Sequence, residues 1–305
     1  MSTGEAEPLP EDAAEPPEPL HRPDRRSLPP GLHFIATPIG AARDITLRAL
    51  DILAAADVLA AEDTRTLRRL MEIHGVPLAG RPLLAYHDHN GEQMRPRLLR
   101  ALEEGKSVAY ASEAGTPLVA DPGFQLSRAA IAAGFPVLAA PGPSAVLAAL
   151  TVAGLPSDRF LFAGFPPAAA GARRRFFAEL AGIPATLVFY ESPKRVSRSL
   201  GEMAEAFGNR EAAVCRELTK RFEEVTRGPL QDLVAAFADR SVKGEIVVLV
   251  DRAQAVVADA ASLEAALEAA LQVMSVKDAA AEVAQKLGLP RRDVYQLALR
   301  LAEEG

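Results

Sequence analysis

The chain has 305 residues and a formal net charge of −6, with 34 lysine and arginine residues against 40 aspartate and glutamate residues. Hydrophobic residues make up 49% of it, which excludes global disorder and provides enough apolar side chains for the cores of roughly two domains. No apolar run approaches the roughly 20 residues that cross a bilayer, and the N-terminus lacks the pattern of a signal peptide. The single cysteine, Cys215, excludes an intramolecular disulfide and favours a reducing, cytoplasmic setting.

Residues 1–30 carry much of the negative charge, with seven acidic and three basic residues, and hold eight of the 24 prolines. The segment has no apolar periodicity, so it buries too little surface to offset the entropy lost on ordering. We therefore expect a disordered extension here. The remainder is close to neutral, and any nucleic-acid surface on it must be a local basic patch.

From Leu32 onward, short apolar runs alternate with helical patterns. We expect strands at residues 32–36, 58–61, 83–86, 108–111 and 137–140. Thr46 is suited to begin a helix as its N-cap, and Gly75 is suited to the left-handed position that ends one. Such alternation predicts a parallel, doubly wound α/β sheet, which we assign to residues 31–152.

A second, mixed α/β domain is expected over residues 153–253, after a connection at residues 152–159 that contains Gly154 and Pro156. Its strand-like runs are residues 160–163, 185–190, 212–216, 224–227 and 245–250, with three helical segments between them. The turn at residues 217–223 is short, which predicts an antiparallel pair on its two sides. Residues 258–305 form a helical extension, in which 275–295 have the shape of a helix-turn-helix with Gly288 at the turn.

Three loops in the first domain are expected to meet at one edge of the sheet. Residues 37–40, 112–117 and 141–144 each follow a strand, and the carboxyl ends of parallel strands are where open α/β sheets bind ligands. Each loop combines glycine, proline and a hydroxyl residue, and Glu113 offers a hydrogen-bond acceptor beside Gly115. The loops predict a small-molecule site without the glycine fingerprint of dinucleotide sites or the phosphate loop. The alternative is that they are ordinary tight turns.

The sequence predicts no metal site. His87, Asp88 and His89 stand together, but metal sites usually need three or four ligands and no histidine or cysteine partner follows at a suitable spacing. These residues fit a solvated loop or a hydrogen-bonding contact to substrate. Cys215 lies in an apolar run and is interpreted as a core residue.

Two similar clusters follow strands of the second domain, at residues 190–195 and 216–221, and each puts a carboxylate beside two cations. Surface ion pairs are one interpretation. A positive surface for a phosphate backbone is the other, to which further arginines are expected to contribute: Arg65, Arg68, Arg69, Arg173, Arg174 and Arg175.

The most specific motifs are residues 35–40, 44–50, 61–65, 114–117, 121–123, 141–145, 190–193 and 216–220. Their order and spacing resemble the ribosomal RNA small subunit methyltransferase I family, and the C-terminal helices resemble that family's appended domain. The resemblance implies two α/β domains of the tetrapyrrole-methylase type with S-adenosylmethionine in the cleft between them. It also implies 2′-O-methylation of a decoding-region cytidine of 16S rRNA within the small ribosomal subunit, by a cytoplasmic homodimer.

Site residues also follow from the resemblance. Those implied to bind the cofactor lie on the three loops and in the second domain: Thr37, Pro38, Gly40, Glu113, Thr116, Pro117, Gly142, Ser144, Ala145, Tyr190, Glu217 and Lys220. The family usually has aspartate where this chain has Glu113. The extra methylene keeps the charge but moves the carboxylate.

Attack by a ribose hydroxyl needs a group that takes its proton. We hypothesise that Glu62 or Asp63 is this base and that Arg65 stabilises a phosphate or the alkoxide, because all three follow a strand at the ligand edge. A second hypothesis is that Lys194, Arg195 and Lys220 bind RNA phosphates. Two other functions stay open at this point: methylation of a tetrapyrrole or other small molecule, and nucleic-acid binding without catalysis.

Overall fold

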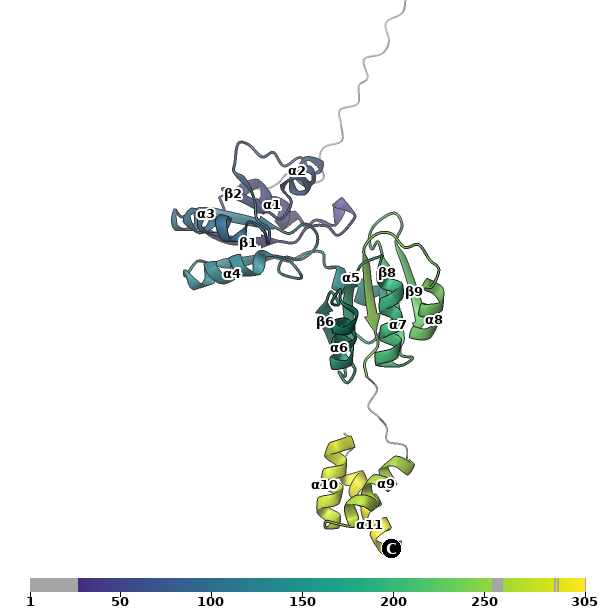
Figure 1. Ribbon diagram of the computed structural model, residues 1–305. Helices are drawn as coiled ribbons and strands as arrows, with labels where there is room; N and C mark the ends of the chain where they lie inside the picture. The colour runs from purple at the N-terminus through teal and green to yellow at the C-terminus, as the bar shows by residue number, and fades with distance from the viewer. Residues whose placement is uncertain (1–26, 254–259, 288, 290, 305) are drawn as a thin grey trace, which may run out of the picture. The chain divides into compact units, whose positions relative to one another are not determined.

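The computed structural model describes residues 27–253, 260–287, 289 and 291–304 (Figure 1). The chain divides into two compact units, Met1–Ala145 and Val146–Gly305. The disordered extension expected over residues 1–30 lies almost wholly outside the described residues, as does the turn expected at Gly288. In the described part Leu28 packs against the core of the first unit.

The first unit is built on a five-stranded sheet in the order β3-β2-β4-β1-β5. Every neighbouring pair in it is parallel. Its strands are β1 (Gly31–Ile35), β2 (Val58–Ala61), β3 (Leu83–Ala85), β4 (Ser107–Ala111) and β5 (Val137–Ala140). The parallel sheet predicted from the sequence is confirmed.

Helices cover both faces of this sheet. On one face α1 (Leu47–Ala55) and α2 (Thr64–Ile73) pack against strand residues such as Leu59. On the other, α3 (Gly91–Glu103) and α4 (Gly123–Ala132) pack against residues such as Val58. Because successive strand residues point to opposite faces, the apolar runs supply both cores, as a doubly wound fold requires. A short 3₁₀ helix, η1 (Ala42–Asp44), precedes α1.

Local signals in the sequence set the ends of these helices. The Thr46 hydroxyl accepts a hydrogen bond from the backbone N–H of Ala49 at 3.2 Å, which makes Thr46 the predicted N-cap of α1. Gly75 follows α2 with φ of +64°, the left-handed conformation expected there.

The second unit holds a five-stranded mixed sheet in the order β6-β7-β10-β8-β9. Its strands are β6 (Phe160–Gly164), β7 (Thr186–Glu191), β8 (Glu211–Arg216), β9 (Glu224–Pro229) and β10 (Ile246–Val250). The pair β6–β7 is parallel and the other pairs are antiparallel, including the predicted pair β8–β9. Helices α6 (Ala170–Leu180), α7 (Val196–Phe207) and α8 (Leu230–Phe237) pack into one core with this sheet. Burial raises the pKa of the Cys215 thiol to about 12, which fits its predicted place in the core.

The expected connection between the domains begins inside a helix. Helix α5 (Ala145–Ala153) continues through Val152, and Gly154, with φ of +74°, follows its last residue. The two units divide between Ala145 and Val146, so this helix groups with the second unit, whereas the sequence placed it in the first. Gly154 and Pro156 therefore mark the end of a helix, a role that glycine and proline share with domain linkers.

Three further helices, α9 (Ala260–Leu271), α10 (Val276–Leu287) and α11 (Arg291–Glu304), share a small core of their own. Leu267, Ala280, Val283 and Val294 are buried in it. This arrangement confirms the predicted helical extension. Among the described residues, none of the helices combines the length and apolarity of a membrane span.

Candidate functional site

The first two loops at the carboxyl edge of the first sheet are bound to each other. Thr37, after β1, and Gly115, after β4, exchange two backbone hydrogen bonds of 3.0 Å each. The Thr37 hydroxyl also donates to the carbonyl oxygen of Ser112 at 3.3 Å, and the Ser112 hydroxyl donates to that of Gly115 at 2.7 Å. Because Gly115 has φ of +79°, the turn suits glycine at this point.

The third loop, after β5, joins the same scaffold. The Thr116 hydroxyl donates to the carbonyl oxygen of Pro143 at 2.9 Å. At Gly142 a Cβ atom would lie 2.9 Å from the Cβ of Ala36, so only glycine allows the loops to approach this closely. The structure thus brings together the three loops that the sequence assigned to one edge.

These bonds change the roles open to the residues on the loops. Thr37 is buried, and the hydroxyls of Thr37 and Thr116 both donate within the scaffold. Gly40, Glu113 and Gly142 are exposed at this edge. A ligand there would therefore meet backbone groups and the Glu113 carboxylate. The remaining loop residues implied by the resemblance are partly buried or buried: Pro38, Pro117, Ser144 and Ala145.

Carboxylates give this edge a negative character. Glu62 follows β2 and is half-buried, and its pKa is raised, first by burial and then by the charges of Asp121 and Glu113. The pKa of Asp121 is also raised by burial, although its Oδ1 accepts hydrogen bonds from the Tyr110 hydroxyl (2.9 Å) and the Gly123 N–H (2.7 Å). Such an edge attracts a cation and holds a carboxylate that is readier than usual to take a proton.

Asp63 and Arg65 bind each other at the start of α2. Asp63 is the N-cap of this helix, and its Oδ1 accepts from the backbone N–H of Arg65 at 2.8 Å. The guanidinium pairs with both oxygens, at 3.3 and 3.2 Å. These hydrogen bonds lower the pKa of Asp63, whereas that of Glu62 is raised. Of the two predicted bases, the geometry favours Glu62.

Sequence reasoning gave no site role to Tyr110 or Asp121, although Asp121 lies in the motif at residues 121–123. A tyrosine in an apolar run needs a partner for its hydroxyl when buried, and an Asp-Pro-Gly sequence favours a side-chain bond to the N–H two residues on. Both features are visible in the sequence and could have indicated that the two side chains are hydrogen-bonded. Leu118 and Ala120 have φ of +69° and +57°, in the left-handed region that favours glycine. Neither residue type indicates this conformation, so the sequence could not predict it.

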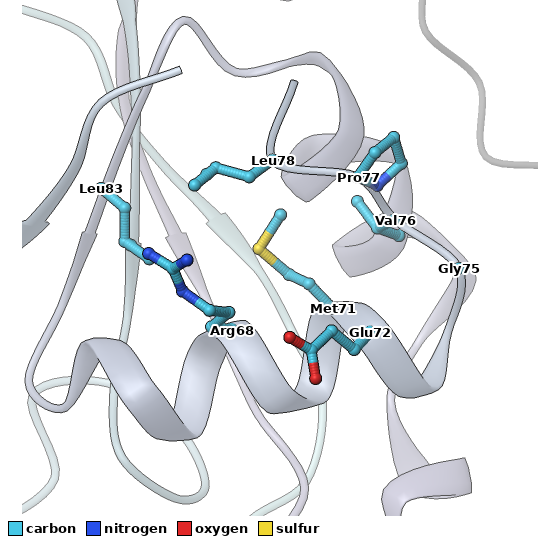
Figure 2. A pocket seen from close by; sticks show the side chains of 8 residues that line it. All are labelled: Arg68, Met71, Glu72, Gly75, Val76, Pro77, Leu78 and Leu83. Carbon is cyan, nitrogen blue, oxygen red and sulfur yellow. The ribbon is translucent and has the colours of Figure 1, made fainter. Parts of the chain in front are cut away.

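A pocket of about 340 Å³ opens elsewhere on the first unit (Figure 2). Met71, Val76, Leu78 and Leu83 give it mostly apolar walls beside the polar side chains of Arg68 and Glu72. Leu83 is the first residue of β3, so the pocket lies toward the amino ends of the strands. It is separate from the loops at the carboxyl edge.

In the second unit, strand pairing gathers the other predicted residues at one sheet edge. Tyr190 near the end of β7 pairs with Val247 near the start of β10, and Arg216 at the end of β8 pairs with Ile246. The loop with Glu217 and Lys220 therefore leaves the sheet at the same edge as Tyr190.

Glu217 and Lys220 tie the loop after β8 to the start of β10. The Lys220 ammonium lies 2.9 Å from Glu217 Oε1 and 3.0 Å from Glu245 Oε2. Glu217 Oε1 also accepts from the Glu245 N–H at 2.9 Å, the contact that contributes most to its lowered pKa. The charge of Lys220 is balanced within the fold, which disfavours it as a phosphate contact.

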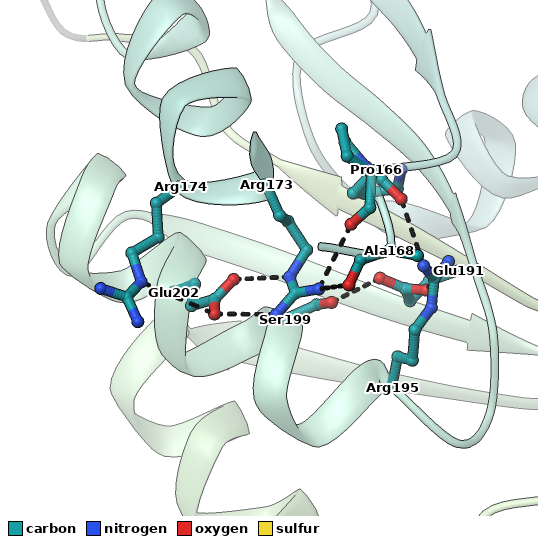
Figure 3. Close-up of polar contacts among 9 residues, drawn as sticks. Pro166, Ala168, Arg173, Arg174, Glu191, Arg195, Ser199 and Glu202 are labelled. Atoms are coloured by element: carbon teal, nitrogen blue, oxygen red, sulfur yellow. Dashed lines mark hydrogen bonds and ion pairs between the residues drawn. The ribbon is translucent and has the colours of Figure 1, made fainter. Parts of the chain in front are cut away.

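Two predicted phosphate-binding arginines point into the fold (Figure 3). Arg173 is 1% exposed and binds Glu202 through Nε (2.5 Å) and Nη2 (2.8 Å). Arg195 lies 2.8 Å from the buried Glu191. The prediction that the whole arginine triplet lines a surface is wrong for Arg173, because it shares a helix face with the core residue Phe177 four positions on.

The fold and the matching residues define the class. The model of the Tetrapyrrole (Corrin/Porphyrin) Methylases matches residues 31–234, and that of the RsmI C-terminal HTH domain matches residues 257–302. Among solved structures, the methyltransferase CobJ matches with a TM-score of 0.57 and 22% identity, over 73% of this chain and 94% of its own. This chain is a methyltransferase with the tetrapyrrole-methylase fold.

Curated relatives narrow the class. Ribosomal RNA small subunit methyltransferase I of Mesorhizobium japonicum is 48% identical over 280 residues, which cover 91% of this chain and 94% of that protein. The protein of the same name from Xylella fastidiosa is 44% identical over 276 residues, with 88% and 99% covered. The chain belongs to the ribosomal RNA small subunit methyltransferase I family, as the motifs indicated, and its reaction requires a methyl donor.

Proposed function

We propose that this protein transfers a methyl group from S-adenosylmethionine to the 2′-oxygen of a decoding-region cytidine in 16S rRNA. The observation that carries the proposal is the scaffold at the carboxyl edge of the first sheet, in which the loop after β4 is hydrogen-bonded to the loops after β1 and β5, in a chain of this family. Small turns with few charges there leave backbone groups to bind a compact ligand.

The residues at this edge fit S-adenosylmethionine. Its sulfonium is a cation, and the carboxylates of Glu62, Glu113 and Asp121 interact electrostatically within the edge, which favours positive charge. Glu113 is exposed and accepts hydrogen bonds only, as recognition of ribose hydroxyls requires. When bound, the donor supplies an electrophilic methyl carbon.

In this proposal Glu62 accepts the proton of the attacking 2′-hydroxyl. Its raised pKa brings it closer to the pH of the reaction, which makes it a more effective base than an ordinary surface carboxylate. Holding the hydroxyl in line with the methyl carbon supplies much of the remaining rate. Arg65, whose side chain is 91% exposed, is proposed to contact the RNA backbone beside its partner Asp63.

The remaining assignments complete the proposal. The cofactor contacts extend to Tyr190, Glu217 and Lys220 of the second unit. The substrate is the 16S rRNA of a small ribosomal subunit, and the enzyme is a cytoplasmic homodimer.

The test is methyl transfer in vitro. Purified protein, S-adenosylmethionine labelled in its methyl group, and small ribosomal subunits that lack the modification are incubated, and 2′-O-methylation is mapped along the RNA. We expect label on one decoding-region cytidine. Label on a base, or no label on subunits and on protein-free RNA, contradicts the proposal. A tetrapyrrole precursor serves as the competing substrate and is expected to stay unlabelled.

A further inference from the structure

Phe165 is an exposed aromatic side chain on a tightly held loop. It lies directly after β6 and is 57% exposed. This exposure is unfavourable, because moving a phenylalanine ring out of water lowers the free energy. One exposed ring is common on protein surfaces. What sets Phe165 apart is the number of interactions that fix its position.

The backbone before and after the ring is constrained. The pairing of β6 with β7 shifts register between Phe162 and Gly164, a bulge of the kind that redirects a side chain at a strand end. Gly164 has φ of +70°, which suits a residue without Cβ. Pro166 and Pro167 follow, and each fixes its own φ.

Two arginines hold the carbonyl groups that come next (Figure 3). Arg173 Nη1 donates to Pro167 O (3.2 Å) and Ala168 O (2.9 Å), and Arg195 Nη1 donates to Pro166 O (3.3 Å). Each arginine is anchored in turn by a carboxylate, as described above for Glu202 and Glu191. Because a buried ion pair is costly to desolvate, we expect these pairs to fix the position of the loop more than they add to the net stability of the fold.

The ring itself rests on a second aromatic side chain. Tyr190 contacts Phe165 edge to face, with ring centroids 5.4 Å apart, and contacts Phe162 in the same way at 4.8 Å. Lys194 follows in the loop after β7, the strand next to β6, and is exposed. Its ammonium makes no ion pair within the described part of the chain. A fixed aromatic face and a cation thus leave the sheet on adjacent strands.

We propose that Phe165 stacks on an unpaired base of the RNA substrate. Proteins recognise single-stranded RNA by stacking bases on aromatic side chains, with nearby cations on the backbone. A ring fixed before binding loses little entropy when a base stacks on it. This inference rests on the proposed function, because RNA is the substrate in both, and it names the contact that holds that RNA.

The chain offers a direct test because it contains no tryptophan. Phe165→Trp gives a protein with one indole at the proposed contact. Phe160→Trp is the matched control, since Phe160 is 43% exposed and lies at the opposite end of the same strand. We expect solvent-exposed emission from both variants. A single-stranded oligoribonucleotide that contains cytidine should quench the indole at position 165 and leave the indole at position 160 unchanged.

A second variant measures the contribution to affinity. Phe165→Leu should weaken binding of the same oligonucleotide roughly 5-fold or more, because stacking of a base is worth about 1–3 kcal/mol, while Phe165→Tyr should retain affinity. The inference is overturned if the indole at position 165 is shielded before RNA is added, or if labelled RNA binds without quenching it. Methylation by the unmodified protein is measured separately, so failure of this contact is distinguishable from failure of the proposed function.

Discussion

The two sheet edges that carry the predicted site residues are held rigid in different ways. At the first, turns with few charges are joined by backbone and hydroxyl hydrogen bonds, with half-buried carboxylates beside them. At the second, guanidinium groups hold carbonyls and carboxylates, and lysine ties strands together. The first edge suits a small cationic donor, whereas at the second edge Lys194 is the one hypothesised phosphate contact that is exposed among Lys194, Arg195 and Lys220. The difference supports the proposal that the first edge binds the methyl donor and that the second edge contacts the RNA.

The largest effect is expected from the buried ion pair of the second unit. Arg173→Ala leaves the Glu202 carboxylate buried without its bidentate partner and should lower the free energy of unfolding of this unit by about 3–5 kcal/mol. Arg174→Ala is the matched control, because the Arg174 side chain is 66% exposed and 3.9 Å from the same carboxylate. Denaturant unfolding of both variants measures the contrast. Equal losses would show that the second edge does not depend on the buried pair.

At the first edge, substitutions of Glu62 and Asp63 test which of the two carboxylates is the base. Glu62→Gln should lower kcat about 100-fold or more, because general bases contribute about 10²–10⁴ to the rate. Asp63→Asn keeps an N-cap side chain and should leave kcat within a few-fold of the unmodified enzyme. Single-turnover methylation of small subunits measures both. The reverse order of effects would move the base to Asp63.

The pH dependence follows from the raised pKa values at this edge. Glu62 acts as a base only when ionised, so the rate should fall as pH drops through its raised pKa. The contribution of Glu62 and Asp121 to stability has the opposite sign. It is present below their unfolded pKa values, near 4, and is lost as pH rises through the raised folded values. The methylation rate of the unmodified enzyme is measured as pH is lowered through the raised pKa of Glu62. A rate that does not fall would argue against Glu62 as the base.

A smaller effect distinguishes two lysines of the second edge. Lys194→Ala should reduce the salt dependence of RNA binding by roughly 0.7 in the slope of log K against log salt, the value for one phosphate contact on a single strand. Lys220→Ala should leave the slope unchanged, because Glu217 and Glu245 already balance that charge. Filter binding over a range of salt concentrations measures both. A lower slope for Lys220→Ala alone would restore it as a phosphate contact.

The sequence predicted the sheets well because apolar runs and turn residues are local signals. Within the described residues, the ten strands of the two sheets overlap the ten strand-like runs expected from the sequence, and the three glycine-and-proline loops meet because topology alone brings parallel strand ends together. The resemblance to a known family rested partly on these same loops and partly on motifs elsewhere, such as residues 61–65 and 216–220. Gly115 and Gly142 could be singled out since no other residue type fits so tight a turn or so close an approach.

Charged side chains were harder to place, because their partners are distant in sequence. Arg173 and Glu202 are separated by 29 positions, and nothing near Arg173 distinguishes it from the exposed Arg174 except helical phase. From the sequence, the position of Asp63 at the ligand edge fits a base and its position before a helix fits a cap, and the structure shows the cap. The importance of Phe165 could not be predicted from the sequence, because it depends on a β-bulge and on hydrogen bonds from Arg173 and Arg195 to the carbonyl groups that follow it.

The central claim, that the three bonded loops of the first sheet hold S-adenosylmethionine, is tested most directly by calorimetric titration. The unmodified protein should bind the donor. Gly142→Val should weaken binding at least about 10-fold, because its Cβ would press on Ala36 and overpacking costs about 1–3 kcal/mol. Gly201→Ala, which meets open space, should bind normally. No uptake by the folded, unmodified protein, or equal affinity in the Gly142→Val variant, would contradict the account.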